Sequence, residues 1–181
     1  MASDHNRNEE QRPQGPKSPP SSTRPTIRFY SRVKPYFEFS NFSDHPIRYN
    51  GKDYSTGEHL FQALKFLNDE DSENIRLQSS PEAAKRMAQT LSHRIREGWI
   101  TRRINMDEVL MLKFTQHQDL RDKLFATGDT SLIEDSPEDP FWGTGADGRG
   151  RNELGKALER LRSVLTPYGG SISMSHIRHD V

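Results

Sequence analysis

Residues 139–152 combine side chains that could do chemistry with a backbone suited to enclosing a ligand. The segment holds the carboxylate of Asp139, the aromatic pair Phe141 and Trp142, several glycines and two arginines. Glycine loses the most backbone entropy on folding, so several in one segment indicate tight turns or close approach to another group. An exposed Trp gains nothing in a loop without a partner. We therefore expect this segment to form one wall of a binding site, with Asp139 available for proton transfer.

Residues 143–148 also match the glycine spacing of a dinucleotide-binding loop. That interpretation needs a strand directly before the glycines and a parallel βαβ unit around them. The only apolar pair upstream is Leu132-Ile133, so the required strand is missing and we disfavour this interpretation. A surface loop is the ordinary alternative. The segment leads into a helix that we expect Asn152 to cap, and free N–H groups at such a helix end attract phosphate or carboxylate.

A second candidate carboxylate, Glu58, stands where a predicted strand meets a predicted helix. Glu58, Gln62 and Lys65 lie at i, i+4 and i+7, which places all three on one helical face at about 100° per residue. That face would project a carboxylate, an amide and an ammonium group together. Two ordinary alternatives compete with a site: a capping box between Ser55 and Glu58, and a solvated polar face.

Trp99 lies among arginines that precede and follow it, Arg103 included. Core packing is the ordinary interpretation of Trp99, and a solvated face is the ordinary interpretation of the arginines. If the ligand carried a phosphate, an arginine beside an aromatic ring would supply both bidentate contacts and stacking.

Other chemistries lack the residues that they need. His59 has no second histidine at i+4, so there is no zincin motif, and the chain has no cysteine for disulfides or thiolate metal sites. Neither a Gly-x-Ser-x-Gly elbow nor a Walker A sequence is present. We expect no metal and no cofactor. The carboxylates of Glu58 and Asp139, with aromatic and basic neighbours, suit cleavage of a sugar–base bond through an oxocarbenium-like transition state.

The elements that must position these residues are short strands and several helices. Residues 26–30 predict a strand, and the Asn50-Gly51 pair between 47–49 and 52–54 predicts a hairpin with a type I′ turn. Apolar spacing and capping signals predict helices over 57–68, 81–91, 105–117, 119–125 and 152–165. The predicted fold class is α+β: a compact, mostly helical single domain with a few short antiparallel strands.

Composition divides the 181 residues into one folded unit and two polar ends. Residues 1–25 have hardly an apolar side chain and are expected to be disordered, and residues 167–181 are expected to form a flexible tail. The domain is then 26–166. No apolar run approaches a membrane span, and no signal peptide is evident, so we expect a cytoplasmic protein, with the nucleus as the alternative.

The net charge of the chain limits which classes of partner we expect it to bind. Lys plus Arg and Asp plus Glu number 26 each, so the net charge is zero. This argues against sequence-independent binding of nucleic acid, although a local basic patch could still hold a nucleic-acid substrate. The sequence carries no signal for the oligomeric state.

The chain resembles the NADAR family, also called YbiA-like, over almost all of residues 29–165. The matching blocks stay in order along the sequence: Phe39-Ser40-Asn41-Phe42-Ser43, residues 54–59, Phe61-Gln62-Ala63, Lys65-Phe66, Trp99 with Arg103, Met106, Lys113-Phe114, Leu124, Thr127-Gly128, Leu132-Ile133-Glu134, Asp139, Phe141-Trp142-Gly143 and Asn152-Glu153-Leu154-Gly155-Lys156.

The resemblance implies an α+β domain with N-glycosidase chemistry. Members of the family are associated with hydrolysing phosphorylated ribosylamino-pyrimidine intermediates of riboflavin synthesis, or with removing ADP-ribose from guanine bases, either free or within nucleic acid. It implies Glu58 and Asp139 as catalytic residues, without saying which is the acid. The residues that it implies would line or order the pocket are Asn41, Gln62, Lys65, Trp99, Arg103, Trp142, Gly143, Asn152 and Lys156. A non-catalytic module that binds ADP-ribose or a nucleotide is the alternative.

One position departs from the family pattern. Gly57 stands directly before the Glu58-His59 pair, where the family often has a small hydroxyl or another residue. We expect a glycine there to loosen the approach to Glu58.

Overall fold

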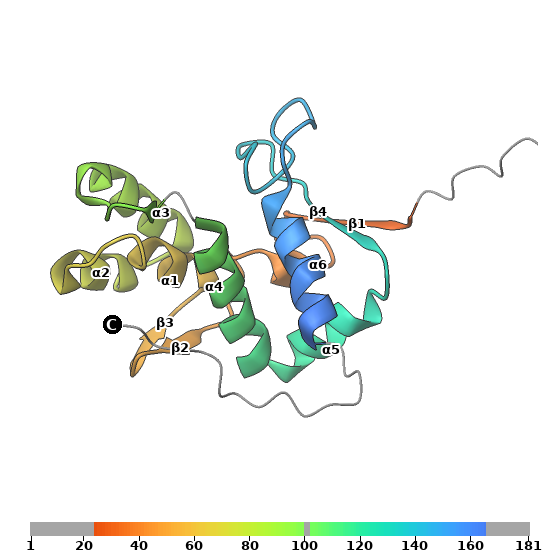
Figure 1. The fold of residues 1–181 in the computed structure, drawn as a ribbon, viewed down its shortest axis with the longest axis horizontal. Coiled ribbons are helices and arrows are strands. Elements are labelled where there is room, and N and C mark those ends of the chain that lie inside the picture. The colour runs from red at the N-terminus through yellow and green to blue at the C-terminus, as the bar shows by residue number, and fades with distance from the viewer. Residues whose placement is uncertain (1–23, 100–101, 166–181) are drawn as a thin grey trace, which may run out of the picture.

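The structure, a computed structural model, describes residues 24–99 and 102–165 (Figure 1). The predicted disordered extension and C-terminal tail therefore lie almost entirely outside the described residues. Arg24 and Pro25 are the exception, since the Pro25 carbonyl accepts a hydrogen bond from Ser131 N at 2.8 Å.

The order of elements matches a mostly helical α+β domain. The strands are β1 (Thr26–Phe29), β2 (Ile47–Tyr49), β3 (Lys52–Tyr54) and β4 (Ser131–Glu134); the helices are α1 (Gly57–Ala63), α2 (Asp69–Arg76), α3 (Pro81–Thr90), α4 (Arg102–Gln116), α5 (Gln118–Ala126) and α6 (Glu153–Leu165), with 3-10 turns η1 (Phe37–Phe39) and η2 (Ser92–Arg94). No helix in the described ranges combines the length and apolar character that crossing a membrane requires.

The strands form two separate pairs. β2 and β3 make the predicted antiparallel hairpin, and Asn50 and Gly51 at its tip both have positive φ, as a type I′ turn requires. β1 and β4 instead pair in parallel, with Thr26 opposite Ser131 and Phe29 opposite Glu134. The expectation of antiparallel strands is therefore wrong for this pair. β4 ends at Glu134, and residues 135–142 between it and Gly143 form no strand, so the strand directly before the glycines that a dinucleotide-binding loop needs is not there.

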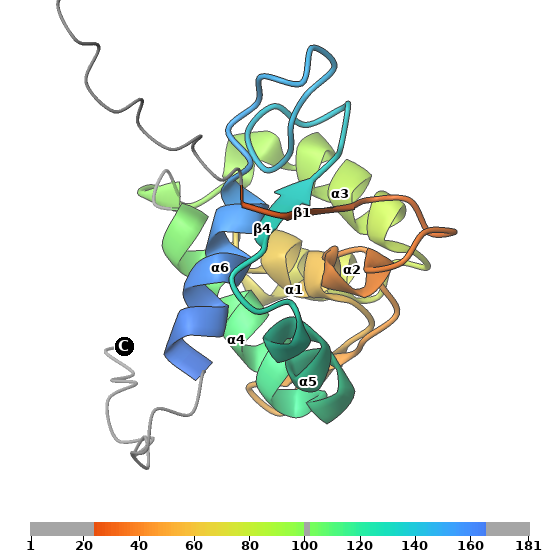
Figure 2. The same cartoon turned by 90° about the vertical axis from the view of Figure 1, so that its right-hand side faces the viewer.

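Asn152, just before α6, and Glu159 on α6 bond to the second edge of β4, which lies beside β1 and α6 in Figure 2. Asn152 Oδ1 accepts a hydrogen bond from Glu134 N, and its Nδ2 donates to the Leu132 carbonyl, both at 2.9 Å. Glu159 Oε1 accepts from Leu132 N at 2.9 Å. These bonds pair main-chain groups that an edge strand would otherwise leave open, which explains how a two-stranded parallel sheet persists.

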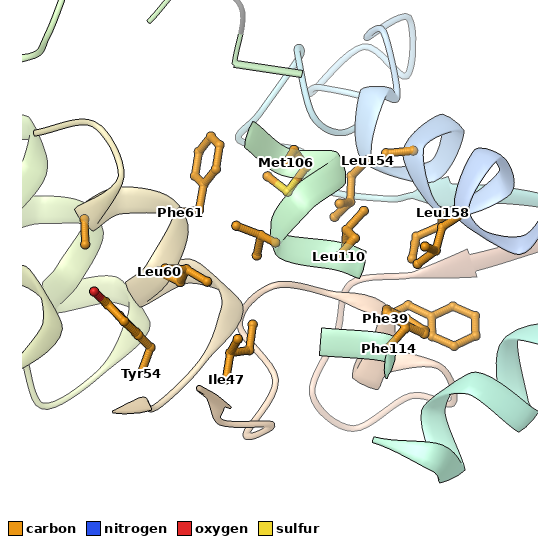
Figure 3. Packing of buried hydrophobic residues seen from close by; sticks show 14 of the residues in the cluster. Phe39, Ile47, Tyr54, Leu60, Phe61, Met106, Leu110, Phe114, Leu154 and Leu158 are labelled. Carbon is orange, nitrogen blue, oxygen red and sulfur yellow. The ribbon is translucent and has the colours of Figure 1, made fainter. Parts of the chain in front are cut away.

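The core lies around α4, which contacts α1, α5, α6 and β2. The residues predicted to be buried on this helix, Met106, Val109, Leu110 and Phe114, are all buried. In Figure 3 Met106 and Leu110 of α4 lie between Phe61 of α1 and Leu154 of α6, while Phe114 lies beside Phe39. The apolar stripes of these helices thus meet as their spacing predicts.

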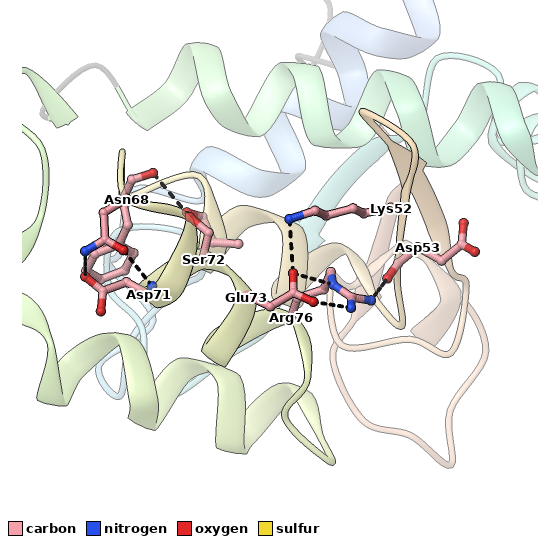
Figure 4. Close-up of polar contacts among 9 residues, drawn as sticks. Lys52, Asp53, Asn68, Asp71, Ser72, Glu73 and Arg76 are labelled. Atoms are coloured by element: carbon pink, nitrogen blue, oxygen red, sulfur yellow. Dashed lines mark hydrogen bonds and ion pairs between the residues drawn. The ribbon is translucent and has the colours of Figure 1, made fainter.

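The predicted helix over 57–68 ends early. α1 stops at Ala63, and Asn68 caps a new helix, α2, by accepting a hydrogen bond from Asp71 N at 3.0 Å. α2 is tied to the hairpin (Figure 4): Glu73 pairs with Lys52 at 3.2 Å, and Arg76 donates to the Asp53 carbonyl at 2.9 Å. The break between α1 and α2 is therefore set by the Asn68 cap and by these tertiary contacts. Apolar spacing along the sequence does not reveal either of them.

Candidate active site

A cavity of about 560 Å³ lies between α1, α3, the loops after β1 and β4, and the first turn of α6. Six of the residues predicted for the site line it: Asn41, Glu58, Gln62, Lys65, Asp139 and Trp142. Trp99, Gly143, Asn152 and Lys156 do not, and the side chain of Arg103 lies outside the described residues. The structure therefore brings together both candidate carboxylates from distant parts of the sequence.

Glu58 points into the protein from the first turn of α1. Thr56, not Ser55, caps this helix: its Oγ1 accepts from His59 N at 3.4 Å. The capping-box alternative for Glu58 is therefore wrong. The Glu58 side chain is buried, and its Oε1 accepts a hydrogen bond from Gln62 Nε2 at 2.6 Å. Burial raises the pKa of Glu58, while the bond from Gln62 acts in the opposite direction.

Gly57 allows a neighbouring loop to close onto the start of α1. A Cβ at this position would lie 2.8 Å from Asn41 Oδ1. The Asn41 carbonyl also accepts a hydrogen bond from Glu58 N at 2.9 Å. The expectation that glycine loosens the approach to Glu58 is wrong, because its missing side chain is what permits this close contact.

Asp139 is fixed by its own loop. Its Oδ1 accepts hydrogen bonds from the backbone N–H groups of Phe141, at 2.9 Å, and Trp142, at 2.8 Å. These two bonds fix the orientation of the carboxyl group within the loop. The charge of Asp139 is one of the influences that raise the pKa of Glu58, so the two groups are electrostatically coupled across the cavity.

The aromatic residues divide between cavity and core. Trp142 lines the cavity and meets Phe61 edge to face, with ring centroids 5.5 Å apart. Trp99 packs behind the same Phe61 ring, also at 5.5 Å, and is buried. The ordinary interpretation of Trp99 as core packing is therefore correct, and Trp142 is the ring that can meet a ligand.

The start of α6 is occupied by the chain itself. The N–H groups of Glu153 and Leu154 donate to the carbonyls of Phe141 and Trp142, each at 3.1 Å, and Asn152 N donates to the Gly143 carbonyl at 3.0 Å. These groups are not free to bind an anion, so the expectation of a phosphate at this helix end is wrong. The glycine segment instead folds back on α6 and orders the wall that carries Asp139.

Gly143 and Lys156 contact other parts of the protein and not the cavity. A Cβ on Gly143 would lie 2.8 Å from Ser136 Cβ and 2.9 Å from the Glu134 carbonyl, so glycine is required for the close packing of this loop. Lys156 is exposed and lies 3.5 Å from Glu153 Oε1.

Three side-chain oxygens in the described part of the chain are buried without a hydrogen-bond partner: Asn41 Oδ1, Gln62 Oε1 and Glu134 Oε2. All three belong to residues that line the cavity. Buried polar atoms without partners are rare in folded proteins. Their gathering around one cavity indicates a site built for a polar ligand.

Sequence reasoning did not assign Glu134, Arg32 or Lys85 to the site, yet all three line the cavity. Glu134 is buried at the end of β4, and burial together with the charges of Asp139 and Glu58 raises its pKa to about 8. Leu132 and Glu134 are both buried, as alternate residues on one face of a strand should be. A carboxyl at an inward position of a short strand is the signal that could have identified it.

Comparison with known proteins adds family context. A family model described as the NADAR domain matches residues 28–166. The chain is 43% identical over 140 residues to the N-glycosidase YbiA of Escherichia coli (strain K12), an alignment that covers 77% of this chain and 88% of that protein. It is 35% identical over 143 residues to a riboflavin biosynthesis protein of Vibrio vulnificus, covering 78% of this chain and 39% of that protein. The solved NMR structure of E. coli YbiA superposes with a TM-score of 0.72 at 42% identity, over 78% of this chain and 84% of that one.

Proposed function

Since this chain belongs to the NADAR family and is an N-glycosidase, we propose that its substrate is a phosphorylated ribose N-glycoside. The two candidates are ADP-ribose attached to a guanine base and a ribosylamino-pyrimidine phosphate intermediate of riboflavin biosynthesis. The observation that carries the proposal is the convergence of Glu58 and Asp139 on one cavity beside Trp142.

The two carboxyl groups suit hydrolysis of a bond between a ribose carbon and nitrogen. As that bond breaks, positive charge develops on the sugar, and a nearby carboxylate stabilises it. A second carboxyl group exchanges protons with the attacking water or the departing base. The Trp142 ring offers a flat apolar surface for the planar base.

Three cationic side chains that line the cavity suit the phosphate. They are Arg32 from the loop after β1, Lys65 after α1 and Lys85 on α3. Arg32 also forms an ion pair with Glu82 at 3.1 Å. Lys85 and Lys65 are both near enough to lower the pKa of Glu58. A cavity of about 560 Å³ is of the size that binds nucleotide-sized ligands.

The test is to incubate the protein separately with a ribosylamino-pyrimidine phosphate and with guanine-ADP-ribosylated DNA. Release of ribose phosphate or of ADP-ribose identifies the substrate. Asp139→Asn should abolish most turnover, while Asp107→Asn serves as a control because Asp107 pairs with Arg160 on the surface. Folded protein that turns over neither compound would refute the proposal, and binding without product would favour a non-catalytic nucleotide-binding module.

A further inference from the structure

Three carboxyl groups in the cavity, those of Glu58, Asp139 and Glu134, differ in the hydrogen bonds that they accept. Glu58 Oε1 accepts a hydrogen bond from the Gln62 amide, and Asp139 Oδ1 accepts two from backbone N–H groups. Hydrogen bonds donated to a carboxylate stabilise its charged form. Glu134 Oε2, by contrast, is buried with no partner in the described part of the chain. Of the three groups, Glu134 is therefore the one whose charge is least compensated.

The charges that face Glu134 come from four elements. Asp139, in the loop after β4, and Glu58, on α1, both oppose its ionisation. Lys113 on α4 and Lys85 on α3 favour it, but burial outweighs them and raises the pKa of Glu134 to about 8. Lys113 is already engaged, because its Nζ donates to the carbonyls of Glu38 and Ser40 and to Ser43 Oγ.

Two further groups next to Glu134 are either paired or uncharged. Asp135, next in the chain, pairs with Arg28 of β1 at 2.6 Å. On the α6 side, the group that contacts the Glu134 backbone is the uncharged amide of Asn152. No additional cation in the structure as described pairs with the Glu134 carboxyl. Glu134 thus lines the cavity as a buried carboxyl group that no described residue holds in a salt bridge.

We propose that Glu134 is the general acid of this site: it enters the reaction protonated and gives its proton to the nitrogen that leaves the ribose. This role rests on the N-glycosidase function proposed above and assigns the acid to a residue other than Glu58 and Asp139. Those two, both held as hydrogen-bond acceptors, then serve as the carboxylates that face the sugar and the attacking water.

The bond between the anomeric carbon and nitrogen breaks, and its electron pair goes to the nitrogen, which takes the proton from the Glu134 carboxyl. Water adds its oxygen to the anomeric carbon and gives a proton to Glu58 or Asp139. The products are the ribose phosphate or ADP-ribose and the neutral base, whose nitrogen now carries the proton. Exchange with solvent returns the proton to Glu134 and removes the one gained by the other carboxylate.

The protonation state can be measured without any substrate. The protein is prepared with isotope-labelled glutamate, and the carboxyl resonance that disappears in Glu134→Gln is followed by NMR as the pH is varied. We expect this resonance to titrate near pH 8. A Glu134 that is already ionised well below neutral pH would overturn the proposal.

The acid role is tested with leaving groups of different basicity. Glu134→Gln should lower turnover of the N-glycoside by about 100-fold or more, as expected for loss of a general acid. Its turnover of a para-nitrophenyl riboside phosphate should change little, because that leaving group departs without a proton. Glu58→Gln should lose activity on both compounds, and the surface variant Asp107→Asn on neither. A merely structural role for Glu134 would lower both activities together.

The pH profile separates the outcomes further. In the wild-type protein, kcat/KM for the N-glycoside should fall as the pH rises through the pKa of Glu134, and this limb should vanish in Glu134→Gln. Glu134→Gln that retains full activity on an N-glycoside would refute the acid role alone. Wild-type protein that hydrolyses no N-glycoside would refute the proposed function and the acid role with it.

Discussion

Replacing Asn152 tests whether this residue binds substrate or holds the site together. Its side chain pairs with Glu134 N and with the Leu132 carbonyl, and its φ of 51° is in the left-handed region. In Asn152→Ala, two main-chain groups lose their partners, at about 1–3 kcal/mol each. Placing alanine in that backbone region adds about 1–2 kcal/mol. We therefore expect Asn152→Ala to lower the free energy of unfolding by about 3–8 kcal/mol.

Two matched variants separate these contributions. Asn152→Gly removes the same hydrogen bonds but tolerates positive φ, so it should be more stable than Asn152→Ala by about 1 kcal/mol. Asn152→Asp keeps the acceptor for Glu134 N but places an oxygen opposite the Leu132 carbonyl, so it should lose stability although it is nearly the same size.

Urea unfolding of the three variants, followed by circular dichroism, measures these differences directly. The cost predicted for Asn152→Ala is a large part of the stability of a typical domain, so its melting temperature should fall by roughly 10 °C or more. If Asn152→Ala unfolds like the wild type yet fails to bind substrate, the structural role is refuted, and Asn152 is a substrate-binding residue as the sequence first indicated.

Three further predictions follow from the same geometry. Glu58→Gln should reduce turnover by about 100- to 10,000-fold without loss of stability in a urea melt, because glutamine has nearly the same size and keeps an oxygen that can accept the hydrogen bond from Gln62; a variant that unfolds instead would indicate a structural role. Trp99→Ala should destabilise the fold by about 3–5 kcal/mol because Trp99 lies in the core, whereas Trp142→Ala should chiefly raise KM; equal effects of the two on KM would contradict this division. Burial lowers the pKa of Lys113 to about 7 from 10.5, so between these values the unfolded chain holds a proton that the folded chain lacks, and stability should rise with pH. Lys113→Met should remove that rise in urea melts across this range, and an unchanged slope would refute the assignment.

Local signals in the sequence predicted much of the fold. The Asn50-Gly51 pair identified the hairpin, because few other residue pairs accept positive φ at both positions of its turn. The apolar spacing of 105–117 and 152–165 identified α4 and α6 and the faces that they bury. These features depend on neighbours within one or two turns, so a single sequence is sufficient to read them.

Features that depend on distant pairing were missed or misread. β4 has only four residues, and its pairing with β1 spans almost the whole domain, so no local pattern reports it. The early end of α1 was missed because the Asn68 cap and the contacts of α2 with the hairpin decide it. Asn152 was assigned correctly to the start of α6, but its attachment to β4 is a tertiary contact.

The same parallel pairing explains how the site is assembled. β4 ends at Glu134 and releases the chain into the loop that carries Asp139, while α6 returns to hold the open edge of the strand through Asn152. Glu58 lies on α1, a separate element that packs against α4. A change that loosens β4 from α6 should therefore move Glu134 and Asp139 together and leave Glu58 in place. In an Asn152 variant of reduced stability, loss of activity would follow from this displacement, with little change in the surroundings of Gln62, whose bond to Glu58 lies within α1.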